Sequence, residues 1–454
     1  MNYFNEMAGD IRHIGVLAVP LILTQLAQVA LTTTDIAMMG MLGPKEIAAG
    51  GLAITIFNQL RTMGTGLVTA TGNLVAYANG KNDSVQIRSL VGASFLLSTF
   101  AGLLFVGVML LIRHPLLWLG QDEDVVQLTQ CYLSIAALGM LPCLWFQVIR
   151  QYTVGLRQPG PLLLITLLSV GLNGGLNYGL MFGYFGLPKL GFVGIAYATS
   201  VVYLLAFLMF FGIVLTRKAL SRPLVSSICH VDRKALRNTW KMGLPIALTY
   251  GSEAAFFTVL TLLIGTLGTH ALAAQTITNQ VVYIVFMISV GLSHASSITI
   301  SHACARKEFS KARRLGYTGL GLGIVAMMVI AILYVSVPDG VISLFLDRDR
   351  GGNMRVFQLA VGLLMIAAVL QVVDCAQNIG IGLLRGLGDV TTSFKMTLMG
   401  YWLVGLPCAY LVGVTLGYGI LGVWVGLLCG LSVTACLLLY MFESRWVSLV
   451  ASAR

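Results

Sequence analysis

The chain of 454 residues is 57% hydrophobic and only 10% charged. Soluble globular domains carry about 25% charged residues, so this composition excludes a soluble domain. The net charge of +11 would suit a nucleic-acid partner, but the basic residues gather in alternate loops, which argues against one and predicts a membrane protein.

Apolar segments long enough to cross the roughly 30 Å hydrocarbon core of a bilayer follow one another along the chain. Only helices and closed barrels satisfy their backbone hydrogen bonds in lipid, and no segment here alternates with a period of two. The sequence therefore predicts an all-α polytopic membrane protein. Its twelve expected transmembrane helices cover about 14–38, 47–77, 88–112, 128–150, 160–184, 190–215, 242–266, 271–301, 315–337, 356–384, 393–415 and 418–441.

The loops between these helices differ in charge. Lys and Arg are concentrated at the two termini, in the 217–241 segment and in the 306–314 segment. By the positive-inside rule these parts are cytoplasmic. The acidic loops at 121–124 and 347–350 then lie outside, and the first span itself starts insertion, since the N-terminus has no cleavable signal.

The chain also repeats itself. Pro20 in LAVPLILTQ aligns with Pro245 in KMGLPIALT at an offset of 225 residues, and GFVGIA aligns with GILGVW further on. Each half holds six spans, so both enter the membrane from the same side and are expected to be related by a pseudo-twofold axis along the membrane normal. We expect an N-terminal lobe at 1–215, a cytoplasmic linker at 216–241 and a C-terminal lobe at 242–454.

Three carboxylates lie inside the predicted spans: Asp35, Glu253 and Asp374. A charge near the centre of a bilayer costs several kcal/mol, so such residues face a bundle interior or a wet cavity. If bases at the span ends are counted with the loops, Arg61 is the one base inside the spans, so structural pairing does not neutralise all three acids. The pattern predicts that the carboxylates handle an ion or a proton.

The acids differ in position. Glu253 and Asp374 lie about 16 to 18 Å from the cytoplasmic ends of their helices, so as a pair at one depth they either share a proton or jointly bind a cation. Asp35 belongs to the other lobe, near the outer end of its span. On the repeat Glu253 aligns with Gln28, and Asp35 aligns with Leu260. The two lobes are therefore expected to differ in chemistry.

Other polar residues within the spans leave alternatives open. Asn173 and Asn177 share one face of a helix, where they either hold helices together or line a cavity. Arg61 either pairs with Asp35 or recognises an anionic group on a substrate. The ion pair is favoured because the first two spans are adjacent.

These residues carry a resemblance to a known family. The chain resembles the MATE (multidrug and toxic compound extrusion) transporters of the NorM type over its whole length. The matching segments are LAVPLILTQLAQ with the following Asp35, GLPIAL with Glu253, and LQVVDCAQNIGIGLLRGLGD with Asp374. LNGGLNYGLMFGYFGLPKLGFVGIAYAT adds the two asparagines and Thr199. The resemblance implies proton coupling at Asp35 and binding of a proton or Na⁺ by Glu253 and Asp374.

Three positions depart from that family's pattern. Leu370 stands where NorM-type chains often carry a tyrosine, four residues before Asp374, which removes an oxygen and weakens the case for sodium. Arg61 occupies a position expected to be apolar, which argues against a simple hydrophobic cation as substrate. Gln59 stands where a proline is expected.

The resemblance implies a secondary active antiporter of the bacterial cell inner membrane. It would act as a monomer without a cofactor, exporting an organic, cationic or amphipathic small molecule in exchange for protons or sodium. The alternative is an exporter or flippase of an endogenous metabolite or lipid-linked precursor, although the spans lack a dense basic lining. A membrane enzyme and a nucleotide-driven pump are not expected, because the sequence contains no HExxH, GxSxG or GxxxxGK[ST] motif.

Overall fold

The computed structural model describes residues 2–42, 44–118, 123–217, 220–221, 224, 232–346 and 354–453. The acidic loop predicted at 347–350 lies outside these residues, and so do Gln121 and Asp122 of the other acidic loop. Most of the basic segment before Asp232 also lies outside them.

Long helices make up most of the described residues, which contain no strand. Eleven of these helices are long and apolar enough to cross a membrane. The predicted all-α membrane fold is therefore confirmed. The remaining predicted span, 47–77, lies in α2 (Pro44–Gly80), which at about 55 Å is long enough to cross but is not one of the eleven. Asn58, Gln59 and Arg61, with several Gly and Thr residues, lower its apolar content.

The chain divides into two compact units, each packed mainly within itself. Unit 1 consists of Met1–Ile22 and Ser252–Arg454, and unit 2 consists of Leu23–Gly251. The units therefore divide α1 (Asn2–Gly40) and α9 (Arg233–Gly265) near their middles. The lobes expected from the sequence follow the internal repeat instead, and so keep each helix whole.

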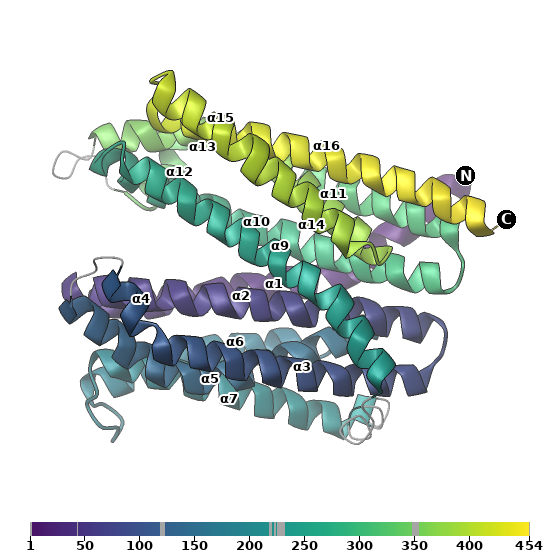
Figure 1. Cartoon of the computed structure of the whole chain (residues 1–454), viewed down its shortest axis with the longest axis horizontal. Helices are drawn as coiled ribbons and strands as arrows, with labels where there is room; N and C mark the ends of the chain where they lie inside the picture. The colour runs from purple at the N-terminus through teal and green to yellow at the C-terminus, as the bar shows by residue number, and fades with distance from the viewer. Residues whose placement is uncertain are drawn as a thin grey trace. The chain divides into compact units, whose positions relative to one another are not determined.

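Unit 2 is a bundle around α5 (Glu123–Gly155), which packs against α2, α3 and α7 (Figure 1). Almost all of α5 from Met140 to Gly155 is buried. The other helices that lie wholly in this unit are α3 (Ser84–Leu111), α4 (Arg113–Trp118), α6 (Leu162–Phe182) and α7 (Phe192–Thr216).

Unit 1 is a second bundle, around α13 (Met354–Gly386), which packs against α10, α11 and α16. The helix α1 begins and α16 ends at the same end of this unit (Figure 1). Its other helices are α10 (Thr269–Ala305), α11 (Phe309–Ser336), α12 (Pro338–Ser343), α14 (Val390–Leu398), α15 (Leu406–Tyr410) and α16 (Gly419–Ala453).

The two bundles repeat one packing scheme. In the order of the spans, α5 is the fourth helix of its half and α13 is the fourth of the other half. Their partners α2, α3 and α7 in unit 2 correspond to α10, α11 and α16 in unit 1. The repeat seen in the sequence is therefore also a repeat of packing.

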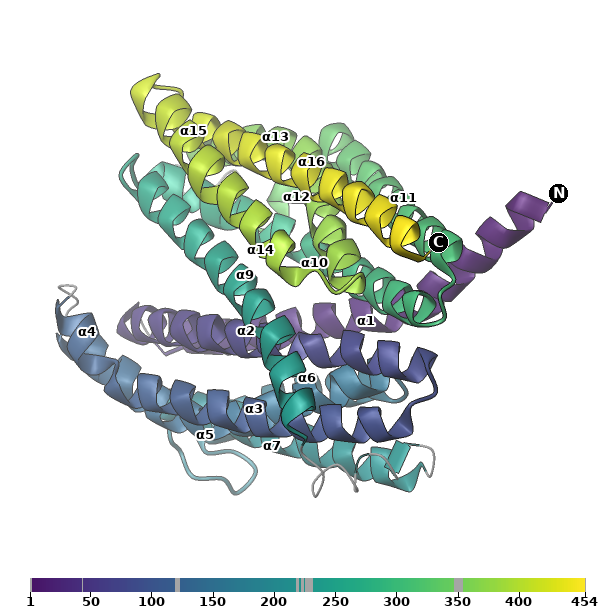
Figure 2. The same ribbon diagram turned by 45° about the vertical axis from the view of Figure 1, so that its right-hand side comes forward.

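Small residues bring the last two spans of unit 1 together. Two segments of π-helix, Met399–Gly405 and Leu411–Thr415, flank α15, and this whole span runs beside α16 (Figure 2). A Cβ atom added to Gly430 of α16 would lie 2.5 Å from the Gly405 Cα and 3.0 Å from the Gly400 carbonyl oxygen. Backbones this close require glycine on both sides, as in other tightly packed membrane helices.

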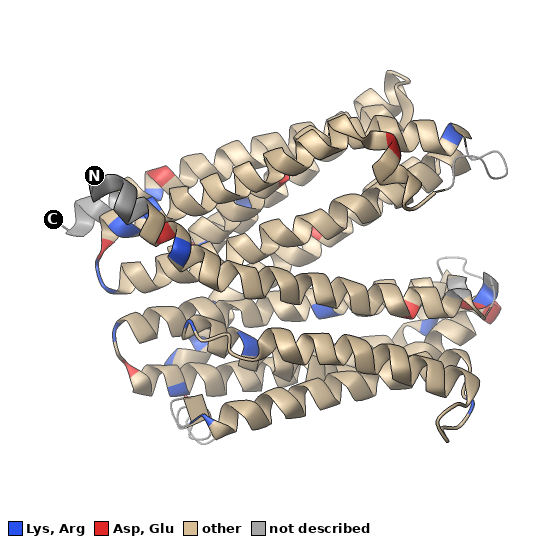
Figure 3. Cartoon of the chain, turned by 180° about the vertical axis from the view of Figure 1, so that it is seen from behind, with Lys and Arg blue, Asp and Glu red and all other residues tan. Residues whose placement is uncertain are grey.

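Charged residues mark the ends of the helices (Figure 3). Most of the Lys, Arg, Asp and Glu residues lie at or beyond these ends, and few lie along the central stretches. The buried charges are therefore exceptions, and each of them requires a partner or a function.

Candidate functional site

Asp35 is the centre of a polar network in unit 2. It lies on α1 and is 3% exposed. Asn177 of α6 donates an amide hydrogen bond of 2.7 Å to Asp35 Oδ1, and Thr199 of α7 donates one of 2.9 Å to Asp35 Oδ2. The structure thus brings together residues that are 142 and 164 positions apart in sequence.

A second ring of bonds fixes these donors. Asn177 also donates to Asn173 Oδ1 at 3.2 Å, and Asn173 donates to Thr199 Oγ1 at 3.3 Å. Thr199 Oγ1 accepts this bond through a lone pair and donates its single proton to Asp35. Asn173 and Asn177 therefore act in one network with Asp35, as the i, i+4 spacing allowed.

The helix α1 presents one face to this site. Gln28, Leu31, Thr32 and Asp35 are spaced i, i+3, i+4 and i+7, so they follow one stripe of the helix. Thr32 donates its hydroxyl to the Gln28 carbonyl at 3.4 Å, as expected for a threonine within a helix. The stripe lines two neighbouring pockets.

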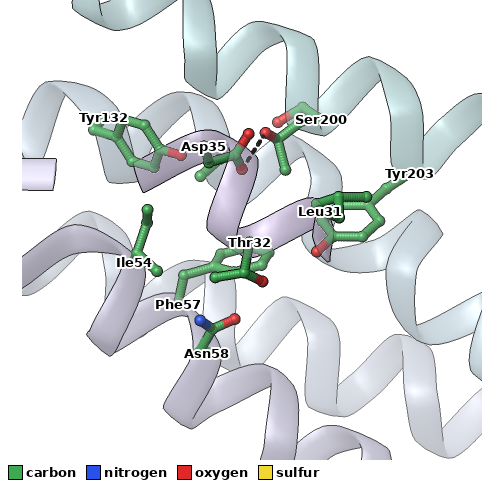
Figure 4. A pocket seen from close by; sticks show the side chains of 11 residues that line it. Leu31, Thr32, Asp35, Ile54, Phe57, Asn58, Tyr132, Ser200 and Tyr203 are labelled. Carbon is green, nitrogen blue, oxygen red and sulfur yellow. Dashed lines mark hydrogen bonds between the residues drawn. The ribbon is translucent and has the colours of Figure 1, made fainter. Parts of the chain in front are cut away.

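The first pocket surrounds Asp35. Tyr132, Tyr203 and Phe57 line it together with Leu31 and Thr199, and Figure 4 shows the two tyrosines on either side of the carboxylate. The pocket thus combines three aromatic side chains with a single carboxylate among its lining residues.

The second pocket contains Arg61 and Gln28, and it shares Leu31, Thr32 and Tyr203 with the first. Arg61 Nε donates to Asn58 Oδ1 at 3.2 Å. Both oxygens of Asp35 accept bonds from the neutral donors described above. The sequence favoured a direct ion pair between Asp35 and Arg61. The hydrogen bonds of these two side chains give that ion pair no support.

Unit 1 holds the second acidic site. Glu253 of α9 is half-buried, and Asp374 of α13 is 6% exposed. Asp374 lies close enough to Glu253 for their charges to interact. Within the described residues no hydrogen bond or ion pair reaches the Asp374 carboxylate, and no group of three His, Cys, Asp or Glu residues suited to a metal is found there.

Tyr401 and Gln377 extend this site and were not predicted from the sequence. The Tyr401 hydroxyl points to Glu253 Oε1 at 3.5 Å, and Gln377 donates to the Tyr401 oxygen at 2.6 Å. Both side chains are buried. Tyr401 lies in the first π-helical segment and stacks on Phe256, with ring centroids 4.9 Å apart. A phenol oxygen thus enters the site from another helix, although Leu370 supplies none.

Two bases correct the sequence-based count. Arg61 was expected to be the one base inside the spans, but Arg150 of α5 is 3% exposed and Arg385 of α13 is 1% exposed. Arg150 donates to Gln147 Oε1 at 3.3 Å, and Arg385 donates to Ser297 Oγ at 3.1 Å. The count was wrong because Arg150, at the last position of the span 128–150, and Arg385, just after the span 356–384, were counted with the loops, whereas α5 and α13 continue past them.

The fold is that of the MATE transporters, a class of multi-pass membrane proteins. A multidrug resistance MATE family transporter of the MOP superfamily, solved in an outward-facing conformation, superimposes with a TM-score of 0.87. The two sequences are 19% identical, and the match covers 97% of each chain.

Relatives found by sequence have a higher sequence identity to this chain than the solved structure has. A probable multidrug resistance protein NorM from Pseudomonas aeruginosa is 38% identical over 442 residues, which cover 96% of this chain and 90% of the relative. The multidrug resistance protein NorM from Burkholderia vietnamiensis is 33% identical and covers 96% of this chain and 95% of its own.

The profile of the MatE family matches the chain twice, over residues 20–179 and 245–411. The two matches begin at Pro20 and Pro245, which are the residues that the internal repeat aligns. The chain belongs to the MatE family, and the NorM-type resemblance predicted from its motifs is confirmed.

Proposed function

We propose that the protein is a secondary active antiporter that exports organic compounds while protons or sodium ions run inward. Its relatives are named as multidrug resistance proteins, which supports drug-like amphipathic or cationic substrates. The cell inner membrane is the proposed location. The basic segments support the proposal that both termini are cytoplasmic, and the proposed functional unit is a monomer.

The bonding of Asp35 is the observation that carries this proposal. This buried carboxylate accepts hydrogen bonds from the neutral side chains of Asn177 and Thr199. An ionised carboxylate in a membrane helix is costly without a compensating charge. A proton or a small cation supplies that charge in one step of the cycle and leaves in another.

Glu253 and Asp374 support the same function in unit 1. Two carboxylates at one site repel each other when both are ionised, so they hold a shared proton or a cation between them. Tyr401 offers an additional oxygen ligand beside Glu253, which keeps sodium as a candidate despite Leu370. A hard cation such as Na⁺ prefers oxygen ligands of this kind.

The driving force is sufficient for export. A unit charge that crosses a potential of 100 mV yields about 2.3 kcal/mol, so one or two ions sustain a substantial concentration gradient. Coupling requires that the ion and the substrate favour different conformations. Loading and unloading of the carboxylates changes their charge and hydrogen bonds, and this change is the proposed link.

The test uses purified protein in proteoliposomes with a proton gradient and a sodium gradient imposed separately. We expect Asp35→Asn, Glu253→Gln and Asp374→Asn each to reduce gradient-driven export at least tenfold. The matched control is Asp83→Asn, because Asp83 is an exposed N-cap, bonded to the Gln86 amide at 2.9 Å, and asparagine caps equally well. Export that survives neutralisation of all three acids would overturn the proposal.

A further inference from the structure

The positive charge of Arg61 lies in a pocket of its own, and the proposed role of the acidic sites assigns this charge no function. This second pocket lies within unit 2, and Arg61 is the one charged residue among those that line it. Gln28, Gln147, Thr166 and Ser169 supply its other polar groups. A guanidinium in a membrane protein pocket marks a site for an anionic partner.

Gln147 and Arg150 add to this positive character from α5. Arg150 Nη1 donates to Gln147 Oε1, so the amide NH₂ of Gln147 remains as the donor available to the pocket. Within the described residues, Arg150 Nε has no hydrogen-bond partner although the side chain is 3% exposed. The wall beside Arg61 therefore offers hydrogen-bond donors and a second positive charge behind them.

The polar groups that α6 contributes to this pocket are acceptors. Thr166 and Ser169 of α6 donate their hydroxyl protons to the Leu162 and Ile165 carbonyls at 2.8 Å, so only the oxygen lone pairs face outward. The neighbouring pocket contains Asp35. The two pockets are thus lined by opposite charges.

The two pockets share part of their walls. Leu31, Thr32 and Tyr203 line both pockets. Along α1, Gln28 of the second pocket and Asp35 of the first are seven residues apart, or about 10 Å at the rise of a helix. A substrate that spans both pockets meets a positive group at one end and a carboxylate at the other.

We propose that Arg61 binds a carboxylate of the transported substrate, and that the protein therefore takes zwitterionic amphiphiles. Arg61 presents a planar fork of N–H donors that matches the two oxygens of a carboxylate. The assignment rests on the proposed export function, but it concerns the charge of the substrate and not the source of energy.

Rhodamine 110 and rhodamine 123 provide the test. The first has a free carboxyl group, and the second is its methyl ester, so the pair differs only in the anionic group. Binding is measured by fluorescence anisotropy with the full-length protein in detergent, without any ion gradient. The variants are Arg61→Gln, Arg61→Lys, which keeps the charge, and Arg237→Gln as an exposed arginine control.

We expect Arg61→Gln to weaken the binding of rhodamine 110 at least tenfold and to change that of rhodamine 123 less than twofold. Arg61→Lys is expected to lie between wild type and Arg61→Gln, and Arg237→Gln is expected to match wild type. Equal weakening for both dyes, or unchanged rhodamine 110 binding, would contradict the proposal. A wild-type preference for the ester would do so without any variant.

The same preparation separates this inference from the antiport proposal. Charge-selective binding without gradient-driven export in proteoliposomes would remove the antiport proposal and keep the role of Arg61. Gradient-driven export by a protein that binds both dyes alike would keep antiport and remove the role of Arg61.

Discussion

Replacement of Thr199 by valine removes the hydroxyl that donates to Asp35 Oδ2 at 2.9 Å while it keeps nearly the same side-chain volume. It also removes the oxygen that accepts from Asn173. Asn177 still donates to Asp35 Oδ1 at 2.7 Å, so the carboxylate keeps one of its two donors. The substitution therefore tests the charge of Asp35 without altering Asp35 itself.

The size of the effect follows from the bond that is lost. A hydrogen bond to a charged group contributes about 1.5–3 kcal/mol, and each 1.4 kcal/mol is a factor of ten. The ionised form of Asp35 in the variant is thus disfavoured roughly 10- to 150-fold relative to the protonated form. If Asp35 must release a proton to the cytoplasm in each cycle, Thr199→Val slows export at neutral pH.

The assay is proton-driven export in proteoliposomes over a series of pH values on the cytoplasmic face. A higher pH favours release of the proton, so export by the variant recovers as that pH rises. We expect the half-maximal point of the profile to move upward by about one to two pH units relative to wild type. The maximal rate at high pH should approach that of wild type.

Thr55→Val is the matched control, because Thr55 is exposed on α2 and donates to the Gly51 carbonyl of its own helix. Its pH profile should coincide with that of wild type. A Thr199→Val variant with an unshifted profile would refute the reasoning, since Asp35 would then not titrate during transport. A uniform loss of export at every pH would refute it as well.

Further predictions concern the other site and the packing. Tyr401→Phe removes an oxygen beside Glu253 and should raise the half-saturating concentration of the coupling ion about three- to tenfold in proteoliposomes, by the loss of about one hydrogen bond; an unchanged concentration dependence would exclude Tyr401 from the site. Gly66→Ala would place a Cβ 2.8 Å from the Ala247 Cα and should destabilise the protein by about 1–3 kcal/mol, seen as a lower melting temperature. Gly51→Ala on the same helix, with nothing within 4 Å of its Cβ, should not lower it, and equal melting temperatures for both variants would contradict the close packing at Gly66.

Helices and the α1 stripe could be predicted because both depend on local sequence. A run of apolar residues must form a helix in lipid, whatever its neighbours are. The spacing of Gln28, Thr32 and Asp35 places them on one face for the same local reason. The predicted span in α2 is the one that is not among the eleven helices apolar enough to cross a membrane. Arg61 and its polar neighbours reduce its apolar content, while the helix remains intact.

Partners of the buried charges could not be predicted in the same way. Tyr401 approaches Glu253 from a helix almost 150 residues further along the chain, and a π-helical segment sets its position. No periodicity in the sequence reports which residues of two distant helices meet. The burial of Arg150 was missed for a related reason, because it depends on the helices that pack around the end of α5.

By itself, then, the sequence determined the class of the protein, its repeat and its three membrane carboxylates, because these follow from composition, spacing and the cost of charge in lipid. Only the tertiary structure decided which neutral donors surround Asp35 and which tyrosine accompanies Glu253. It also decided that Arg61 lines a pocket beside that of Asp35. These features arise where helices distant in sequence pack together, and packing depends on the shapes of all the side chains at once.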